Sequence, residues 1–224
     1  MKVHFIILAA LVTLVAPSLS AATPPRPGPY ASGFMGVSAP RNADVTGYDY
    51  FNGIPFDERV EFDPGINIGG TGGFDYGLVR LEGELSYKHG EMATITDSSG
   101  VQYRNVDGTV GALAMMFNVF MDLHNPSPVT PYFGGGIGVA ALHLSDTFGT
   151  SDGSRTLLYL EDDDSVFAYQ VGAGLEIALN RSLSLDLGYR YFATTKGRFD
   201  SSYDIDTELK FQSHNAAVGL RVKF

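Results

Sequence analysis

Apolar and polar residues alternate one by one over long stretches of this chain. In the clearest stretch, Leu78–Lys88, the odd-numbered positions from Val79 are Val, Leu, Gly, Leu and Tyr, and the even-numbered positions are Arg, Glu, Glu, Ser and Lys. Because successive side chains of a β-strand point to opposite faces, this period of two predicts a strand with one apolar and one charged face. A helix is excluded, since residues three and four positions apart would mix the two classes.

Seven further segments read as strands, which brings the expected number to eight. The alternation is clear in 166–179, 182–192 and 215–224, and weaker or Gly-rich in 30–39, 64–76, 109–122 and 130–142. Most segments reach about ten residues, the length that a tilted strand needs to cross a bilayer. These strands predict an all-β fold, a closed antiparallel up-and-down transmembrane β-barrel. The even number of strands lets both termini lie on the same side, as bacterial barrels require.

The connections between these segments alternate in length. Short turns are expected around 75–77, 123–129 and 180–181, and long loops at 40–63, 89–106, 143–165 and 193–207. Outer-membrane barrels of bacteria sort short periplasmic turns from long extracellular loops in this way, whereas a soluble β-sandwich has no reason to do so. Aromatic residues near strand ends predict the girdles of such a barrel: Tyr30, Phe74, Phe133, Tyr189, Tyr191 and Phe224.

The N-terminus predicts export. A charge at Lys2, an apolar run over 5–16 and small residues up to Ala22 are typical of a cleaved secretory signal peptide, assigned to residues 1–22. The run is too short for a membrane anchor, which needs about 20 apolar residues. A Pro-rich segment, 23–29, then leads into a single barrel domain, 30–224, in the outer membrane.

Composition excludes several classes of function. The chain has no Cys and a formal net charge of −10, which argues against a disulfide-stapled fold and against nucleic acid as a partner. No cofactor and no metal is predicted, because the His residues have no ligand spacing. The acidic run Glu161–Asp164 has the chemistry to hold Ca²⁺, but such runs are more often solvated loops. The acidic loops are also candidates to reach lipopolysaccharide phosphates through Mg²⁺ or Ca²⁺.

Four segments, 131–138, 167–174, 187–192 and 219–224, resemble the fifth, sixth, seventh and last strands of the eight-stranded outer-membrane barrel family, which contains the OmpA-like transmembrane domain and the opacity-type surface proteins. In the last segment, Gly219, Val222 and Phe224 resemble the signal that the barrel-assembly machinery reads, although Ala217 stands where that signal usually has a polar residue. The resemblance implies fold and location. It implies little about activity, because family members differ in their loops.

Charged residues on the inward faces predict a lumen network. Its members are Arg80, Glu82, Glu84, Lys88, Glu176, Asp186, Arg190 and Arg221, with Asp122 and Lys223 beside them. An ion path or a catalytic carboxylate pair is one interpretation of these charges. The numbers of acidic and basic residues are equal, five of each. This balance favours the other interpretation, in which the charges neutralise one another and plug a narrow interior.

One pair of residues offers an enzymatic alternative. On a strand, His143 and Ser145 would project from one face, so the imidazole could activate the hydroxyl, with Glu161 orienting the His. A similar His-x-Ser pair serves the lipid A deacylase barrels, but Asp146 stands here where those barrels usually have Asn.

The sequence favours a non-enzymatic outer-membrane surface protein whose four acidic loops serve envelope structure, adhesion or surface interaction. Its expected partners are outer-membrane lipid and lipopolysaccharide, the assembly machinery, and host or cell-surface ligands. A lipid A deacylase and a narrow channel remain the alternatives.

Overall fold

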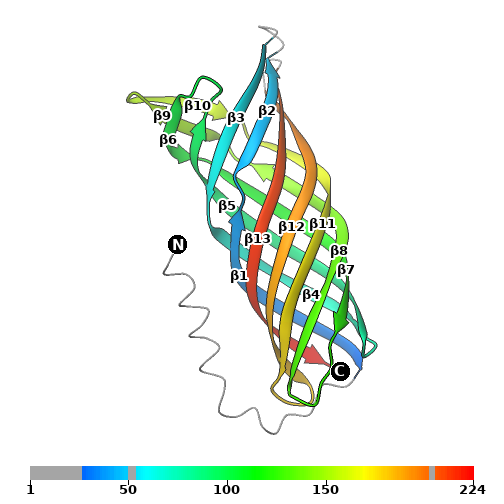
Figure 1. Cartoon of the computed structure of the whole chain (residues 1–224). Helices are drawn as coiled ribbons and strands as arrows, with labels where there is room; N and C mark the ends of the chain where they lie inside the picture. The colour runs from blue at the N-terminus through cyan, green and yellow to red at the C-terminus, as the bar shows by residue number, and fades with distance from the viewer. Residues whose placement is uncertain (1–26, 50–53, 202–204) are drawn as a thin grey trace.

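The computed structural model describes residues 27–49, 54–201 and 205–224 (Figure 1). The predicted signal peptide, 1–22, and most of the Pro-rich segment lie outside these residues. Within the described part, no helix is long and apolar enough to cross a membrane. The chain forms antiparallel strands, and their bounds are β1 Gly28–Pro40, β2 Ala43–Asp49, β3 Ile54–Asp63, β4 Gly65–Asp75, β5 Val79–Thr96, β6 Gln102–Asp107, β7 Thr109–Asp122, β8 Val129–Leu144, β9 Thr147–Ser151, β10 Ser154–Tyr159, β11 Asp162–Ala178, β12 Leu183–Ser201 and β13 Ile205–Lys223.

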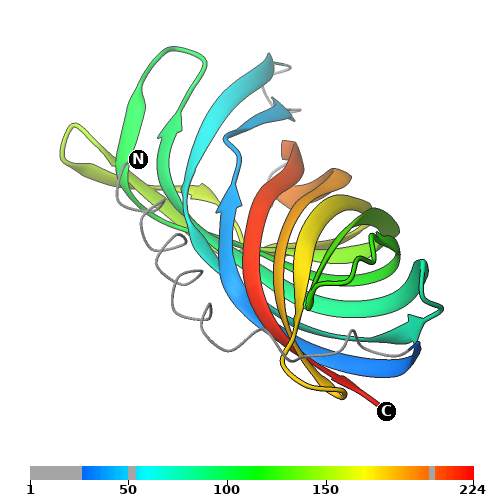
Figure 2. The ribbon, with the colours of Figure 1, turned by 60° about the horizontal axis from the view of Figure 1, so that its bottom comes forward.

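The pairing of the long strands closes on itself. Starting from β1, the neighbours are β4, β5, β7, β8, β11, β12 and β13, and β13 pairs again with β1. The curved wall of this ring is visible in Figure 2. Closure leaves no strand edge in this part of the wall, so backbone N–H and C=O groups pair within the protein. The predicted closed antiparallel barrel is confirmed.

Alternation along each strand separates the two surfaces of the wall. On β5, Arg80, Glu82 and Glu84 are buried inside the barrel. Leu85, the residue after Glu84, faces outward. The outer surface carries a belt of exposed apolar side chains, among them Met35, Ile68, Leu85, Leu113, Met115, Phe117, Ile137, Val139, Phe167, Val171 and Leu220. Successive side chains along each strand point alternately to the lumen and to the lipid. This explains why the charges of these strands are buried and their apolar residues are exposed.

The prediction of four long loops is wrong for much of their length. Residues 43–49 and 54–63 form β2 and β3, residues 147–151 and 154–159 form β9 and β10, and β5, β12 and β13 extend above the belt. Strand pairing continues there because the alternation also continues: Val45, Val60 and Ile95 point inward and are buried. We call this upper part, β2, β3, β6, β9, β10 and the outer ends of β5, β11, β12 and β13, the head. On it, β6, β9 and β10 project sideways from the barrel (Figure 1).

The interior is divided into two parts along the barrel axis. The half near the short turns contains the charged side chains of β5, and the half that continues into the head contains an apolar core. The core includes Met92, Leu142, Phe192, Leu209 and Phe211. On β5 the change from polar to apolar comes after Lys88, the last buried charge of the strand.

Glycines that face the lumen leave room for long side chains. A Cβ at Gly174 would lie 2.4 Å from the Tyr132 ring and from the Leu187 carbonyl oxygen, whereas a Cβ at Gly33, on the lipid face, would meet nothing within 4 Å. We expect Gly174→Val to destabilise the barrel by about 1–3 kcal/mol through overpacking. Gly33→Val is the matched control and should have little effect. The measurement is the temperature at which unheated, compact protein converts to the slower form in electrophoresis; equal shifts for both variants would contradict this packing.

Candidate functional site in the barrel lumen

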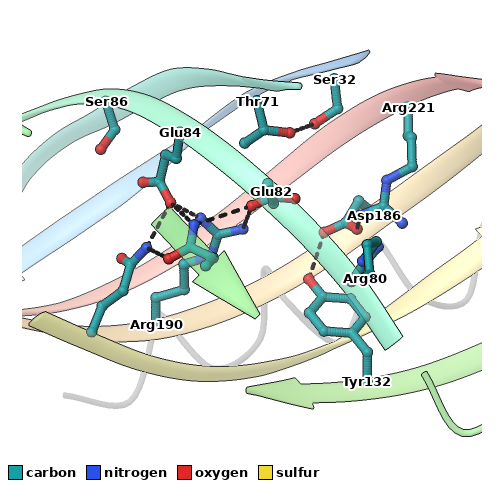
Figure 3. A network of polar contacts seen from close by, with 12 residues as sticks. Ser32, Thr71, Arg80, Glu82, Glu84, Ser86, Tyr132, Asp186, Arg190 and Arg221 are labelled. Carbon is teal, nitrogen blue, oxygen red and sulfur yellow. Dashed lines mark hydrogen bonds and ion pairs between the residues drawn. The ribbon is translucent and has the colours of Figure 1, made fainter. Parts of the chain in front are cut away.

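The inward faces of β5, β7, β11, β12 and β13 bring together the charges that the sequence predicted for the lumen. Figure 3 shows six of them: Arg80, Glu82, Glu84, Asp186, Arg190 and Arg221. Most of them are fully enclosed, while Asp186 and Arg190 are partly accessible. Two groups of contacts can be distinguished: one around Glu84, next to the apolar core, and one around Glu176, near the short turns.

Glu84 is the centre of the first group. Its carboxylate pairs with Arg190 and accepts hydrogen bonds from Gln170 Nε2 at 2.6 Å and Asn118 Nδ2 at 3.0 Å. Arg190 also pairs with Glu82 at 3.2 Å. One guanidinium therefore contacts two carboxylates of the same strand, and Lys88, 4.0 Å from Glu84, supplies a second positive charge. Charge-assisted hydrogen bonds from several directions make these carboxylates tolerable in a buried position.

Glu176 is the centre of the second group. It pairs with Arg221, with Lys223 at 3.4 Å and with Arg80 at 3.6 Å. Arg221 also reaches Asp186 at 2.6 Å. Arg80 has a further carboxylate, that of Asp122, at 3.3 Å.

Aromatic side chains are part of the network. The hydroxyl of Tyr30 donates to Glu82 at 2.8 Å and that of Tyr132 donates to Asp186 at 2.7 Å. The Arg80 guanidinium lies 4.6 Å from the centre of the Tyr132 ring and 5.3 Å from that of Phe120. Tyr30 was expected in an outer girdle; it points inward instead, because it shares the parity of Ser32 rather than that of the exposed Ala31.

The sequence missed one charged member, Asp75. It is buried and forms an ion pair with Lys223, whose Nζ lies 2.7 Å from its carboxylate. We expected it in a turn, but it is the last residue of β4 and lies opposite Arg80. Its parity with the buried Asn67 and Thr71 was the available signal. With Asp75, the lumen holds six acids against five bases: Asp75, Glu82, Glu84, Asp122, Glu176 and Asp186 against Arg80, Lys88, Arg190, Arg221 and Lys223.

The free space between these side chains is small. A polar cavity lined by Glu82, Glu84, Arg190 and Arg221 has a volume of about 20 Å³, enough for roughly one water molecule. Toward the head, Lys88 lies against the Phe192 ring at 4.3 Å, and Phe192 packs edge-on against Phe211 with ring centres 6.2 Å apart. The polar cavity therefore ends at the apolar core.

His143 and Ser145 do not form the predicted pair. The Ser145 hydroxyl accepts a hydrogen bond from the Thr109 N–H at 2.9 Å and lies 3.3 Å from the Asp146 carbonyl oxygen, to which it donates. His143 Nδ1 lies 2.8 Å from Asp163 Oδ1, so Asp163, and not Glu161, is the carboxylate beside it. The strand ends at Leu144, and Ser145 therefore does not continue the alternation that would have placed it beside His143.

The acidic run is divided between the two faces of β11. Asp163 reaches outward to His143, whereas Asp164 accepts a hydrogen bond from the Arg198 N–H at 2.8 Å. Among the described residues, no group of three or more His, Asp or Glu side chains is arranged to hold a metal ion.

A half-buried carboxylate in the head is held differently. Glu58 of β3 accepts a hydrogen bond from the Tyr159 hydroxyl of β10, which ties the projecting strands to the barrel rim. Burial raises the pKa of Glu58, and the hydrogen bond from Tyr159 acts in the opposite direction.

The residues of the expected assembly signal lie on the strand that closes the ring. Val222 and Phe224 are exposed on the outside, and Gly219 lies against the Gly33 carbonyl oxygen of β1, 2.9 Å from where its Cβ would be. That the assembly machinery reads these residues stays a prediction.

Comparison with known proteins gives one family and several relatives. The family model for the outer membrane protein beta-barrel domain matches residues 6–224. Outer membrane protein PagN of Salmonella typhimurium is 27% identical over 188 residues, which cover 80% of this chain and 70% of PagN. An uncharacterized protein of Brucella abortus is 40% identical over 86 residues, 37% of this chain and 30% of that protein. The chain thus spans less than a third of this relative.

Two solved structures show the same fold. OprG from Pseudomonas aeruginosa superposes with a TM-score of 0.59 at 14% identity, covering 91% of this chain and 99% of OprG. Neisserial surface protein A has a TM-score of 0.51 at 17% identity, covering 88% of this chain and 97% of the other. At these identities the likeness concerns the fold alone.

The network predicts a large difference between buried and exposed arginines. Arg221→Ala would remove the ion pair of Asp186 and one of the three cations around Glu176, so we expect a loss of about 3–5 kcal/mol in the free energy of unfolding. Arg155→Ala removes the exposed pair with Asp107 at 3.2 Å, which should cost less than about 1 kcal/mol. The free energy of unfolding is measured for both variants by urea titration in lipid vesicles. Unfolding is followed by Tyr fluorescence, since the chain has no Trp, or by electrophoretic mobility. Similar losses would mean that Arg221 is not central to the network.

Proposed function

We propose that this chain, which belongs to the outer membrane protein beta-barrel domain family, is a non-enzymatic surface protein of the bacterial outer membrane. In this proposal the barrel is a plugged anchor, and the acidic head makes the contacts with the surroundings. The observation that carries the proposal is the division of the interior, in which a paired charge network meets an apolar core.

Paired charges argue against a channel. Each charge of the network has an opposite charge within 4.0 Å or less, and the cavity between them is small. An ion that entered from the short-turn side would have to break these pairs and then cross the apolar core, where a charge costs several kcal/mol to desolvate.

The contacts of Ser145 argue against the deacylase alternative. Its hydroxyl is engaged with two backbone groups, and His143 is engaged with Asp163. A nucleophile needs its base within hydrogen-bond reach, and here each side chain already has another partner.

The head is the natural place for recognition, since it is carried on a rigid scaffold. Its acidic surface suits basic or cation-bridged partners on the envelope, on a host or on a neighbouring cell. Lipopolysaccharide contacts and docking of the C-terminal strand to the assembly machinery belong to the same proposal.

A conductance and lipid analysis distinguishes the three functions. In planar bilayers we expect no stepwise current from the wild-type protein, because the lumen is filled. Ser145→Ala should leave the acyl pattern of lipid A unchanged in cells that express it, by mass spectrometry against the wild type. A steady single-channel current would favour the channel, and an acyl chain lost only with the wild type would favour the deacylase.

The role of the head is tested by shortening it. Replacing residues 147–159, which include β9 and β10, by a short Gly-Ser turn should leave the barrel heat-modifiable, because the closed ring does not include these strands. We expect the attachment of expressing cells to host-cell layers or to each other to fall several-fold. Ser145→Ala serves as the control at the same rim. Unchanged attachment with a folded, surface-exposed variant would refute a head-based role.

A further inference from the structure

Basic residues are unevenly distributed on the outside of the head. Seven exposed Lys and Arg side chains lie on this half of the described chain: Arg41, Arg59, Arg104, Arg155, Lys196, Arg198 and Lys210. Four of them lie on one side of the barrel: Lys196 and Arg198 on β12, Lys210 on β13, and Arg41 where β1 ends beside β13. We call these four the basic edge. The β12 and β13 ribbons that carry most of it are adjacent, orange and red in Figure 1.

Neighbouring strands hold the basic edge together. Lys196 lies directly opposite Lys210 in the β12–β13 register, and the Arg41 N–H donates to the Gln212 carbonyl oxygen at 2.8 Å. Two like charges directly opposite each other destabilise a sheet unless a counter-charge is present. An anion beside Lys196 and Lys210 would therefore relieve the repulsion between their two positive charges.

The protein itself provides only part of that counter-charge. Glu208 accepts Lys196 at 2.7 Å and Arg198 at 3.4 Å, so one carboxylate serves two cations. On the other side of β13, the exposed Asp44 of β2 lies directly opposite Arg59 of β3 in the strand register. Within the described residues, Lys210 and Arg41 have no ion pair.

The basic edge lies just above the lipid belt. Below it on the outer surface, Tyr189 and His214 share a hydrogen bond of 2.6 Å, and the ring centres of Tyr191 and His214 lie 5.2 Å apart. Tyr side chains of this kind mark the boundary between hydrocarbon and headgroups. Lys210 is four residues from His214, about 13 Å along the strand and roughly 10 Å in height for a tilted strand. Long basic side chains bend toward the membrane from such positions.

Other parts of the same rim have the opposite charge. Asp63 of β3 lies directly opposite Glu91 of β5, and Asp163 is exposed on β11. Four of the seven exposed basic residues of the head thus lie over β12, β13 and the end of β1, although the chain as a whole carries a net charge of −10. A general attraction to anions does not explain this arrangement, since it would not require the basic residues to gather at one place above the belt.

We propose that the basic edge binds the phosphate groups of a glycolipid headgroup in the outer leaflet. Lys196 and Lys210 bind the phosphate between them, and Arg198 and Arg41 extend the site along the rim. The contact is direct and needs no bridging cation. This inference rests on the proposed function, because it names the chemistry of the lipopolysaccharide contact included there. It can fail while the attachment role of the head stands, since the two are measured separately.

Retention of lipid A by the folded protein tests the proposal. The full chain is reconstituted in phosphatidylcholine nanodiscs with either bisphosphorylated lipid A or the same lipid A without phosphates, extracted in mild detergent and analysed for lipid A per barrel by mass spectrometry. We expect several-fold more of the phosphorylated lipid, and retention that falls as salt is raised.

Two double variants separate position from charge. Lys196→Gln with Lys210→Gln removes two charges of the basic edge and breaks one exposed pair, with Glu208. Arg104→Gln with Arg155→Gln removes two charges from the projecting strands and also breaks one exposed pair, with Asp107. The first should lose retention on the order of tenfold, and the second should keep it. Heat-modifiability confirms that both are folded.

Three results would overturn the proposal. These are equal retention by the two double variants, equal retention of the two forms of lipid A, and loss of the lipid to inorganic phosphate at constant ionic strength, which would indicate a free-anion site instead of a lipid site.

Discussion

A peptide group inside a bilayer has no water to hydrogen-bond, and the closed ring of strands is the response of this chain to that constraint. Each long strand finds a neighbour on both sides, and the first and last described strands, β1 and β13, pair over eleven residues to complete the wall. Everything else follows from this closure. Once the wall is closed, period-two alternation directs every second side chain into a narrow interior, and that interior must be filled or neutralised.

The charged network fills the half of the interior near the short turns. Its ion pairs connect residues far apart in the chain, such as Asp75 with Lys223 and Glu84 with Arg190. Removing one partner is expensive because the other stays desolvated, so the network stabilises a particular register as well as neutralising charge. The aromatic rings around Arg80 occupy the space that its pairs leave. The excess of one carboxylate over the cations is a consequence of Asp75, which completes the pairing of Lys223.

Above the last buried charge, Lys88, the interior changes to an apolar core that continues into the head. The side chains of these strands fill the barrel in the half near the short turns. Above it, the same strands extend and pair with one another to form the head. Because the head is built from strands that extend the wall, its outer face has a defined pattern of charge. This is why the basic edge over β12 and β13 can be distinguished from the acidic rim over β3, β5 and β11.

The sequence by itself determined which side chains face lipid and which face the lumen, because alternation is a local property of a strand and needs no knowledge of its neighbours. The barrel, its short turns and all ten predicted lumen charges followed from it. Only the tertiary structure decided which charges meet, since pairing depends on register between strands that are distant in the chain. Strand parity already places Asp75 and Tyr30 on the lumen side, but only the structure showed that they meet Lys223 and Glu82. It also separated Ser145 from His143 where β8 ends. The structure also shows strands at residues that were expected in loops. A polar segment can form a solvated strand wherever a neighbouring strand pairs with it.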